Sequence, residues 1–275
     1  MFLVPKPETL QLESTNDCFM NCWICMRANS RRSVGYLSME NYRKLPLSKF
    51  REVAFHGWGE PLLHPKICEM ISYAKSLGLK ASLITNGYLL SKKAEELIDS
   101  GLDELAVGIY TLRGRDAVLR GVKEFLELRR SLSKPKVLFD ITILKENLSE
   151  IPEIIEVGSE LGIDAVVLHR LFNAHNPKLL RPTKDEERKL LKEVDRISKS
   201  LGIKVFKPPT KQLRPCIVVL KCMFITWDCK YSPCCFLAEL GHTLGNALRD
   251  DVFRIHRDFV IRGFRRYGVC KSCPW

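Results

Sequence analysis

The sequence predicts an α/β protein, a partial (β/α)6 TIM-like barrel followed by a small cysteine-rich domain. Short runs rich in Val, Ile and Leu alternate with helical patterns up to about residue 205, and ten of the eleven cysteines fall into two groups near the ends of the chain. Six successive βα units with apolar strands favour a parallel sheet covered by helices. Because parallel crossovers are right-handed, such units curl most naturally into a partial barrel. An open doubly wound sheet is the alternative.

Each barrel unit is predicted from a strand-like run and the helical pattern that follows it. Strands are expected at 10–15, 52–57, 80–85, 103–110, 136–144 and 164–169. Helices are expected at 38–48, 66–77, 91–100, 115–131, 149–161 and 184–200. Gly follows four of the helical patterns, in SLGLK, DSGLDE, ELGID and SLGIK, as helix C-termini favour. Ser38, Ser91 and Thr183 stand where N-caps belong, with Lys184-Asp185 as an alternative start for the last helix.

The pattern changes after residue 206. The segment KPPTKQLRPC (207–216) is a linker rich in proline and lysine, and the sequence that follows it is rich in cysteine. One stretch there, 247–264, has a helical period, with an apolar stripe of Leu248, Val252, Phe253, Phe259 and Val260. We therefore expect a barrel domain at 1–205 and a second domain at 206–275.

The composition bears on where the protein works. No run of 18 apolar residues is present, and the N-terminus MFLVPKPETL lacks the basic and apolar regions of a secretion signal. We expect a cytoplasmic protein with no membrane partner. Disulfides are rare in that reducing compartment, so metal or cluster ligation is the better explanation of so many cysteines. Cys68, on a predicted helix, is expected to be a small buried apolar residue.

The charge is asymmetric. The formal net charge is +12, and residues 199–275 hold 14 Lys and Arg against 5 Asp and Glu, a net of +9. A basic segment can bind nucleic acid or an acidic substrate. Bound clusters with thiolate ligands would carry negative charge and offset part of this excess, so nucleic acid is disfavoured as a partner.

The first cysteine group, Cys18-x3-Cys22-x2-Cys25, follows the first predicted strand. Three thiolates leave one iron of a [4Fe–4S] cluster open to a small molecule; a zinc site with an external ligand competes, but the nearest histidine is His56. This CxxxCxxC spacing resembles the signature of the radical S-adenosylmethionine (radical SAM) superfamily. HGWGEPLLHP (56–65) resembles the family's GGEP segment, and TNG (85–87) is also typical.

The resemblance assigns cofactor residues. It implies that Cys18, Cys22 and Cys25 hold a [4Fe–4S] cluster whose fourth iron is chelated by the amine and carboxylate of SAM. The segment Gly57-Trp58-Gly59-Glu60-Pro61 would lie along the methionine moiety, and glycine there would let the backbone approach the ligand closely. Trp58 departs from the usual glycine. Asn86 is a candidate for the ribose, although Asn before Gly is as often a turn former.

The fourth strand departs further from the family. Relatives often carry Ser-x-Asp or Ser-x-Glu where this chain reads GIYTLRGRDAVLRG (108–121). Arg113, Arg115 or Arg120 could neutralise the SAM carboxylate, and Arg120-Gly121 best matches the family's Arg-Gly; a solvated helix face is the alternative. Three strand-end residues, one of which could deprotonate a substrate hydroxyl, are candidate catalytic groups: Tyr110, His169 and Arg170.

The second cysteine group resembles the SPASM/twitch domains found in many radical SAM enzymes. The features shared with them are an IxWDxxxxPCC pattern, then LGN (244–246), then a terminal CxxC, with Cys229 at a family glycine position. The resemblance implies one auxiliary [4Fe–4S] cluster, as in the shorter twitch form, held by Cys216, Cys234, Cys270 and Cys273. Cys222, Cys229 and Cys235 are left over, and the choice between Cys234 and Cys235 stays open. A zinc ribbon is the alternative.

The function that the resemblance implies is a radical SAM oxidoreductase. Reductive cleavage of SAM would give a 5′-deoxyadenosyl radical that abstracts hydrogen from a substrate. A fully ligated auxiliary cluster would accept an electron from the substrate radical, as in small-molecule dehydrogenases of the twitch type. Peptide or protein maturation is the alternative, disfavoured because the first strand starts near residue 10 and leaves no room for a peptide-recognition domain; a tRNA-modifying enzyme is a further one. The expected partners are a small-molecule or peptide substrate and a ferredoxin- or flavodoxin-like electron donor.

Overall fold

The chain forms two compact units. A computed structural model describes residues 5–130, 132–175, 181–209, 216–263 and 266–274. The first unit combines Met1–Ser82, Phe172–Pro177 and Lys211–Trp275, and the second combines Leu83–Leu171 with Lys178–Thr210. The cysteine-rich C-terminal segment therefore belongs to the same compact unit as the first strands, although the two are far apart in the sequence.

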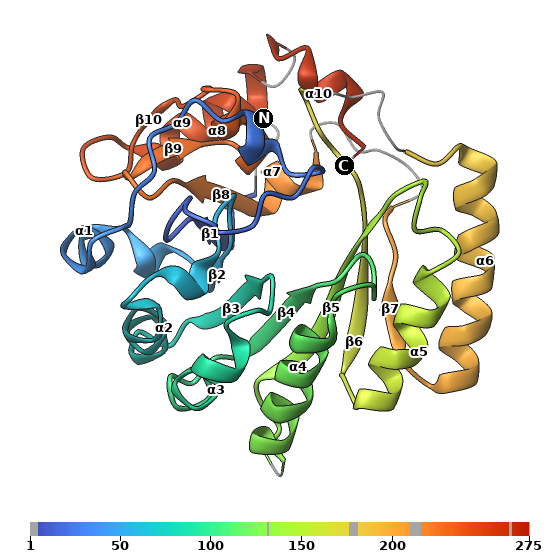
Figure 1. The fold of residues 1–275 in the computed structure, drawn as a ribbon. Coiled ribbons are helices and arrows are strands. Elements are labelled where there is room, and N and C mark those ends of the chain that lie inside the picture. The colour runs from blue at the N-terminus through green and yellow to red at the C-terminus, as the bar shows by residue number, and fades with distance from the viewer. Residues whose placement is uncertain (1–4, 131, 176–180, 210–215, 264–265, 275) are drawn as a thin grey trace. The chain divides into compact units, whose positions relative to one another are not determined.

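The first unit is built on five strands in the order β10-β9-β8-β1-β2. Their bounds are β1 (Thr9–Leu12), β2 (Glu52–Phe55), β8 (Cys222–Ile225), β9 (Lys230–Ser232) and β10 (Gly245–Asn246). β1 pairs in parallel with β2 on one side and β8 on the other, as Figure 1 shows, and β8-β9-β10 is antiparallel. The sequence pattern predicts β1 and β2 but not β8 to β10, which are short.

Short helices join these strands. They are α1 (Met39–Lys44), α2 (Ile67–Ser76), α7 (Ile217–Lys221), α8 (Cys235–Glu239), α9 (Val252–Asp258) and α10 (Val269–Ser272), with single turns η1 (Met26–Asn29), η2 (Leu47–Lys49), η3 (Pro61–Leu63) and η4 (Phe259–Gly263). The single helix predicted at 38–48 is divided into α1 and η2. Pro46 accounts for the break, because proline lacks the N–H that a helix interior needs and disfavours helix at the residue before it.

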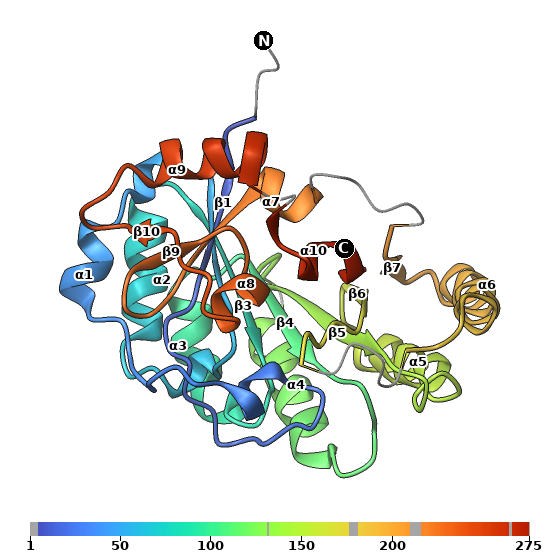
Figure 2. The ribbon, with the colours of Figure 1, turned by 90° about the horizontal axis from the view of Figure 1, so that it is seen from above.

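The second unit has four parallel strands in the order β4-β5-β6-β7. They are β4 (Glu104–Gly108), β5 (Lys136–Ile143), β6 (Ala165–Arg170) and β7 (Lys204–Phe206). The helices are α3 (Leu90–Asp99), α4 (Asp116–Arg129), α5 (Ile151–Leu161) and α6 (Lys184–Leu201), and β3 (Lys80–Thr85) crosses the boundary between the units. Figures 1 and 2 show α4, α5 and α6 on the same side of these strands. Helices on one side are the arrangement of a barrel, whereas a doubly wound sheet has helices on both.

The predicted α/β class is thus confirmed, with parallel strands, covering helices and a cysteine-rich C-terminal segment. Most of the predicted helix ends are confirmed as well. Thr183 begins α6 with a full capping box, and Gly162 and Gly202 end α5 and α6 with φ of 82° and 68°. Ser91 is not an N-cap, since α3 begins at Leu90 and the residue before it makes no side-chain cap.

The two faces of the second sheet differ in polarity. Alternate side chains that pack beneath the helices are almost completely buried: Leu105, Val107, Val137, Phe139, Ile141, Val166 and Leu168. The other face carries a small apolar cluster at its amino half, made of Ala106, Leu138 and Ala165 with Ile84 and Val167. Its carboxyl half is polar. The polar side chains there are Asp140, Thr142 and His169. Barrels of this kind bind their ligands at the carboxyl ends of the strands, so a ligand is expected at this edge.

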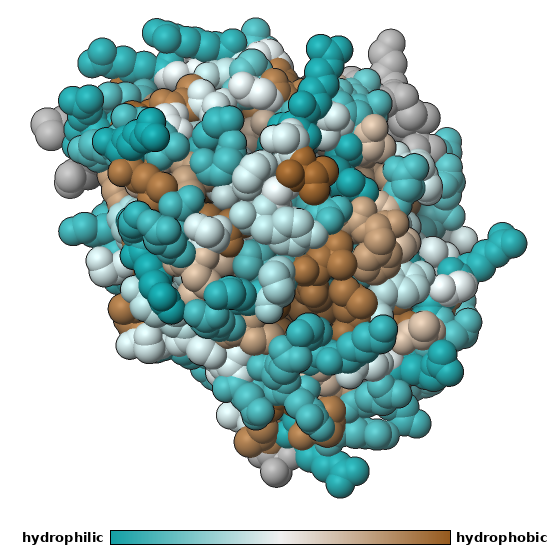
Figure 3. Space-filling view, turned by 60° about the vertical axis from the view of Figure 1, so that its left-hand side comes forward, coloured by the Kyte–Doolittle hydropathy of each residue, from teal (hydrophilic) through white to brown (hydrophobic). Residues whose placement is uncertain are grey.

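On the face drawn in Figure 3, hydrophobic residues form limited patches within a mostly hydrophilic surface. No helix in the described part of the chain has the length and apolar character needed to cross a membrane. Cys68, expected to be buried, is partly exposed on α2. Most of the predicted linker, 210–215, lies outside the described residues, as do residues 131 and 264 at the ends of two predicted helices. The domain boundary expected near residue 206 remains a prediction.

Candidate functional site

The loop that follows β1 carries Cys18, Cys22 and Cys25, and the last two lie in one turn. The N–H of Cys25 donates to the carbonyl of Cys22 at 2.9 Å. The Arg27 guanidinium donates to the carbonyls of Cys18 and Met20 at 2.8 and 2.7 Å, and the N–H of Met20 points at the Cys18 Sγ at 3.4 Å. One arginine therefore holds the loop from within, and an amide faces a sulfur as it does around many iron–sulfur clusters.

Burial and neighbouring thiols shift the pKa of two cysteines in this loop. Burial raises the pKa of Cys18 and raises that of Cys25 to about 11; nearby backbone N–H groups oppose this, and the neighbouring cysteines add to it. The free thiols of Cys18 and Cys25 are therefore protonated near neutral pH, and they would lose their protons on binding a metal centre. Three soft sulfur donors within eight residues suit an iron–sulfur cluster with one open iron.

The segment Gly57 to Glu60 packs against the chain that leads into this loop. A Cβ on Gly57 would lie 2.8 Å from the Cβ of Glu13, and one on Gly59 would lie 2.2 Å from the carbonyl oxygen of Thr15. The N–H of Glu60 donates to the carbonyl of Asp17 at 2.7 Å. Glycine is thus required at both positions by close contact within the protein, a constraint additional to the approach to a ligand that the sequence suggests.

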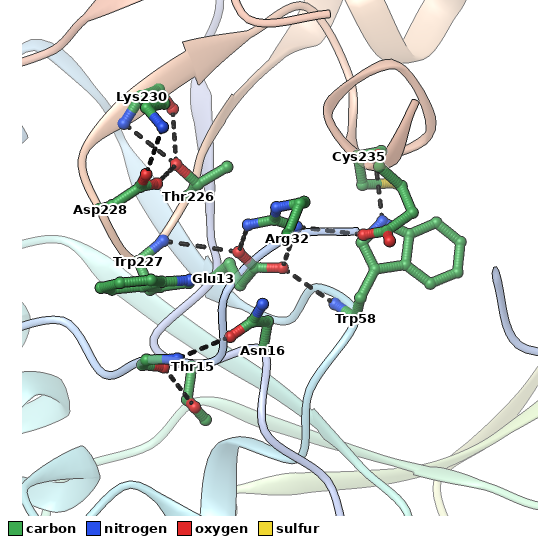
Figure 4. Close-up of polar contacts among 12 residues, drawn as sticks. Glu13, Thr15, Asn16, Arg32, Trp58, Thr226, Trp227, Asp228, Lys230 and Cys235 are labelled. Atoms are coloured by element: carbon green, nitrogen blue, oxygen red, sulfur yellow. Dashed lines mark hydrogen bonds and ion pairs between the residues drawn. The ribbon is translucent and has the colours of Figure 1, made fainter. Parts of the chain in front are cut away.

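Trp58 packs toward the C-terminal segment. Its indole Nε1 donates to the backbone carbonyl of Cys235 at 2.9 Å, and its ring lies edge-on to Phe236 at 5.5 Å between centroids. Phe236 in turn meets Phe172 at 4.6 Å. The residue that replaces the family glycine therefore joins the GWGEP segment to α8, as Figure 4 shows for Trp58 and Cys235.

A buried ion triad lies beside this contact. Arg32 donates through Nη1 to Glu13 Oε1 at 3.0 Å and to Glu239 Oε2 at 3.1 Å, and its Nη2 pairs with Glu13 Oε2. The side chains of Glu13 and Glu239 are 0% and 1% exposed. Figure 4 shows Glu13 at the centre, where it also accepts from the N–H groups of Trp58 and Trp227 at 3.4 and 3.5 Å. The triad joins β1, the segment after the cysteine loop and α8.

The C-terminal cysteines that the sequence assigns to an auxiliary cluster lie near one another. Cys216, Cys234 and Cys270 pack against one apolar core of Val219, Leu237, Phe259 and Val260. Burial raises the pKa of Cys234, and Cys235, Cys273 and Cys270 raise it further. Cys234 therefore sits beside the CxxC pair. As the side chains stand, no group of three or more His, Cys, Asp or Glu in the described chain is placed to hold a single metal ion.

The remaining C-terminal cysteines face other partners. Burial raises the pKa of Cys235 to about 12, with Gln11 bound to its thiol and Glu13 close by, so it points toward β1. Cys222 faces Thr9 and Glu52, with Cys216 also near it. Cys229 is buried and has a φ of 61°, the left-handed conformation that the family glycine at this position would adopt freely. Cys234 thus lies near the CxxC pair whereas Cys235 faces β1, and which of the two is a cluster ligand stays a prediction.

The second unit places two predicted site residues, Asn86 and Tyr110, just after the carboxyl ends of its strands. Asn86 follows β3 and accepts from the N–H of Tyr88 at 3.1 Å, so it forms a turn, with Gly87 at a φ of 81°. Tyr110 follows β4, and its carbonyl accepts from Asn147 at 2.9 Å. Gly108 has open space above it, since an added Cβ would meet a single carbonyl at 3.6 Å. The edge beside Tyr110 is therefore not filled by a side chain at 108.

His169 has a carboxylate partner that the sequence did not indicate. Its Nε2 lies 2.9 Å from Asp140 Oδ1 across β5 and β6. Burial lowers the pKa of His169, but the charge and hydrogen bond of Asp140 together raise it above the ordinary value. The pair thus stabilises the fold fully below about pH 6.5, and this contribution is lost as the pH rises through the raised pKa. A single acid within the apolar strand KVLFDITIL is the signal that could have revealed Asp140.

The arginines of this unit differ in their surroundings. Arg170 is bound through Nε and Nη2 to Glu187 on α6 and donates to the carbonyl of Pro209 at 2.7 Å, so it supports the fold. Arg120 and Arg113 are exposed, as the solvated-face alternative expects. Arg115 is buried, with 5% of its surface exposed. The SAM role given to Arg120 and the catalytic role given to Arg170 stay predictions, because no contact of these side chains within the described residues supports them.

Comparison with known proteins shows the family. The model of the radical SAM superfamily matches residues 12–158, more than half of the chain, and an iron–sulfur cluster-binding domain, SPASM, matches residues 216–274. A tungsten-containing aldehyde ferredoxin oxidoreductase cofactor-modifying protein of Pyrococcus furiosus is 26% identical over 59% of this chain and 51% of its own length. A probable GTP 3′,8-cyclase of Sulfurisphaera tokodaii is 29% identical over 76% and 68%. The PqqA peptide cyclase of Gluconobacter oxydans is 28% identical over 78% and 65%.

Solved structures share the fold. SuiB of Streptococcus suis bound to S-adenosylmethionine superposes with a TM-score of 0.76 over 98% of this chain and 72% of its own, at 16% identity. BtrN in complex with AdoMet and 2-DOIA superposes with a TM-score of 0.56 over 97% and 92%, at 18% identity. At these identities the likeness concerns the fold alone.

The motifs, the fold and the two family matches agree. Enzymes of this family use a [4Fe–4S] cluster and SAM, and the SPASM domain binds auxiliary iron–sulfur clusters. The chain belongs to the radical SAM superfamily, with a SPASM iron–sulfur domain at residues 216–274.

Proposed function

We propose that this chain is an oxidoreductase that removes a hydrogen atom from a small-molecule alcohol and passes a second electron to one auxiliary [4Fe–4S] cluster. Cys18, Cys22 and Cys25 would hold the first cluster, and Cys216, Cys234, Cys270 and Cys273 the second. When bound, the first cluster and SAM supply the hydrogen abstraction, and the auxiliary cluster supplies an electron acceptor. A ferredoxin- or flavodoxin-like protein is the proposed electron donor.

One observation carries the oxidative assignment. Cys234 lies beside Cys270 and Cys273, and Cys216 packs on the same apolar core. Four protein thiolates would complete the ligand shell of a [4Fe–4S] cluster and leave no open iron for substrate. A cluster of this kind serves electron transfer, which an oxidation needs and a redox-neutral rearrangement does not.

The carboxyl edge of the second unit supplies proton chemistry. Oxidation of an alcohol to a ketone removes one hydrogen atom, one electron and the hydroxyl proton. His169 can accept that proton in its neutral form, and Asp140 stabilises the imidazolium that results. Tyr110 is the second candidate at this edge, whereas Arg170 is already engaged by Glu187.

Iron analysis combined with low-temperature EPR tests this proposal. On anaerobically prepared protein we expect about eight iron per chain, with one reduced-cluster signal that shifts on adding SAM and one that does not. About four iron, all responsive to SAM, would leave the oxidative proposal without its electron acceptor. As an independent check, Cys18→Ala, Cys22→Ala and Cys25→Ala should each abolish 5′-deoxyadenosine formation.

Peptide modification is the second candidate, because relatives and structural neighbours act on or bind peptides. They include the PqqA peptide cyclase, SuiB bound to its precursor peptide SuiA, and anSMEcpe bound to the Cp18Cys peptide. Deuterium transfer into 5′-deoxyadenosine separates the two. Label arriving from a deuterated secondary alcohol supports the first candidate, and label arriving from a deuterated peptide library supports the second.

A further inference from the structure

Arg115 occupies an unusual environment at the carboxyl edge of the second unit. It stands at the N-cap position of α4, in the loop after β4, and 5% of its surface is exposed. Its guanidinium carbon lies 5.5 Å from the ring centroid of Tyr88 and 5.1 Å from that of Tyr110. The cation is therefore held between two tyrosines, one after the TNG segment and one at the end of β4.

This buried cation lacks a counter-charge. Within the described part of the chain, the guanidinium of Arg115 has neither a carboxylate nor a hydrogen-bond acceptor as partner. Glu150, an acidic residue that contacts the same loop, is committed elsewhere, since it accepts from Thr111 Oγ1 and the N–H of Leu112 at 3.0 and 2.6 Å. None of its nitrogens is among the fully enclosed side-chain atoms that lack a hydrogen bond, so the small exposed part of Arg115 leaves the guanidinium open to solvent and to an incoming anion.

Three other shielded arginines in the described part of the chain have carboxylate partners. Arg32 has two glutamates, Arg129 has Asp164 and the carbonyl of Pro135, and Arg170 has Glu187. The absence of a partner for Arg115 among the described residues is thus a departure from the way the rest of this protein treats buried guanidinium groups. It suggests that the partner comes from outside the chain.

The chemistry of this position selects an oxyanion. Guanidinium presents five N–H donors in a planar fork that matches carboxylate and phosphate groups. The N-terminus of α4, a helix of 14 residues, lies at the same place, and the side chain at its N-cap position accepts no hydrogen bond from the helix. Helix N-termini favour negative charge; Asp116 in the first turn supplies part of it, so the guanidinium of Arg115 is the feature that selects an oxyanion, and the helix N-terminus adds to its attraction.

We propose that Arg115 anchors an anionic group, a carboxylate or a phosphate, of the substrate. SAM also carries a carboxylate, but in this family that group is a ligand of the cluster iron. Arg115 stacks on Tyr110, which lies at the strand end where the proposed substrate chemistry takes place. The anion that Arg115 binds is therefore assigned to the substrate. This proposal rests on the proposed function in placing the substrate at this edge.

Anion binding by the full chain, cluster included, tests the anchor without any turnover. Inorganic phosphate and acetate serve as probes, with ³¹P NMR and calorimetry as readouts. Arg115→Gln should weaken phosphate binding roughly tenfold or more, as expected for a charge-assisted contact. Arg113→Gln, an exposed arginine two residues earlier in the loop, should bind within about twofold of the wild type. Equal binding by the wild type and Arg115→Gln overturns the proposal.

Two further readouts distinguish a substrate anchor from a SAM contact and from a structural role. SAM affinity, followed by the cluster EPR signal, should be unchanged in Arg115→Gln. A loss of SAM affinity with intact phosphate binding would assign the guanidinium to SAM and overturn the substrate anchor.

Arg115→Met keeps the stacked stem of the side chain and removes its charge, so this variant should melt no lower than the wild type. Phosphate should raise the melting temperature of the wild type alone. Strong destabilisation without any effect of phosphate would show a structural role. Because these tests need no SAM cleavage, a failure of the proposed function leaves their outcome readable.

Discussion

Replacing Arg32 by Met is expected to destabilise the first unit strongly, because it leaves two buried carboxylates without their cation. Glu13 and Glu239 are 0% and 1% exposed at their side chains, and Arg32 is 17% exposed. Burial lowers the pKa of Arg32, but its hydrogen bonds and attraction to Glu13 and Glu239 outweigh this and raise that pKa above its ordinary value, so the guanidinium is charged at neutral pH. Breaking a buried pair by removing one partner costs about 3–5 kcal/mol. The triad joins three separate segments, so the loss should reach the cysteine loop as well.

Urea unfolding of the anaerobic protein, followed by circular dichroism, measures this change. Lys44→Met is the matched control, because Lys44 pairs with Glu40 at side-chain exposures of 58% and 76%, and so exposed an ion pair adds little to stability. Adding Glu239→Gln to Arg32→Met removes one of the two buried charges and should recover part of the loss. If Arg32→Met unfolds within about 1 kcal/mol of the wild type, the triad does not stabilise the unit as its burial and geometry indicate.

Three further predictions concern single sites. Cys234→Ala should lose about four iron per chain while Cys235→Ala keeps them; the reverse result would exchange the two assignments. Asp140→Asn should lower the pKa of His169, because the attraction that raises it is removed, and a ¹³C-histidine NMR titration would show no change if the pair were incidental. Cys229→Gly should have a free energy of unfolding about 1 kcal/mol higher than Cys229→Ala, because a φ of 61° strains any residue with a Cβ; equal stabilities in denaturant would contradict this.

Most helices and most of the longer strands could be predicted from local sequence patterns. Helix ends follow from neighbouring residues, as at Thr183 with Glu186 and at Gly202, because capping is satisfied within a few positions of the chain. The cysteine spacing and the GWGEP segment were sufficient to indicate the family. The strands β8 to β10 were not predicted, since runs of two to four residues carry too little periodicity and owe their pairing to partners elsewhere in the chain.

The tertiary structure decided what the same residues do. Arg32 binds Glu239, which lies 207 residues further along the chain, and Trp58 donates to the carbonyl of Cys235, which lies 177 residues further along. No local pattern encodes such contacts, because they depend on β8 pairing beside β1. The sequence alone determined the chemistry, namely thiols for clusters and glycines for close approach. The fold determined which thiol faces the CxxC pair, which arginine lies between two tyrosine rings with no carboxylate beside it among the described residues, and which acid stands beside His169, because these depend on how distant segments pack together.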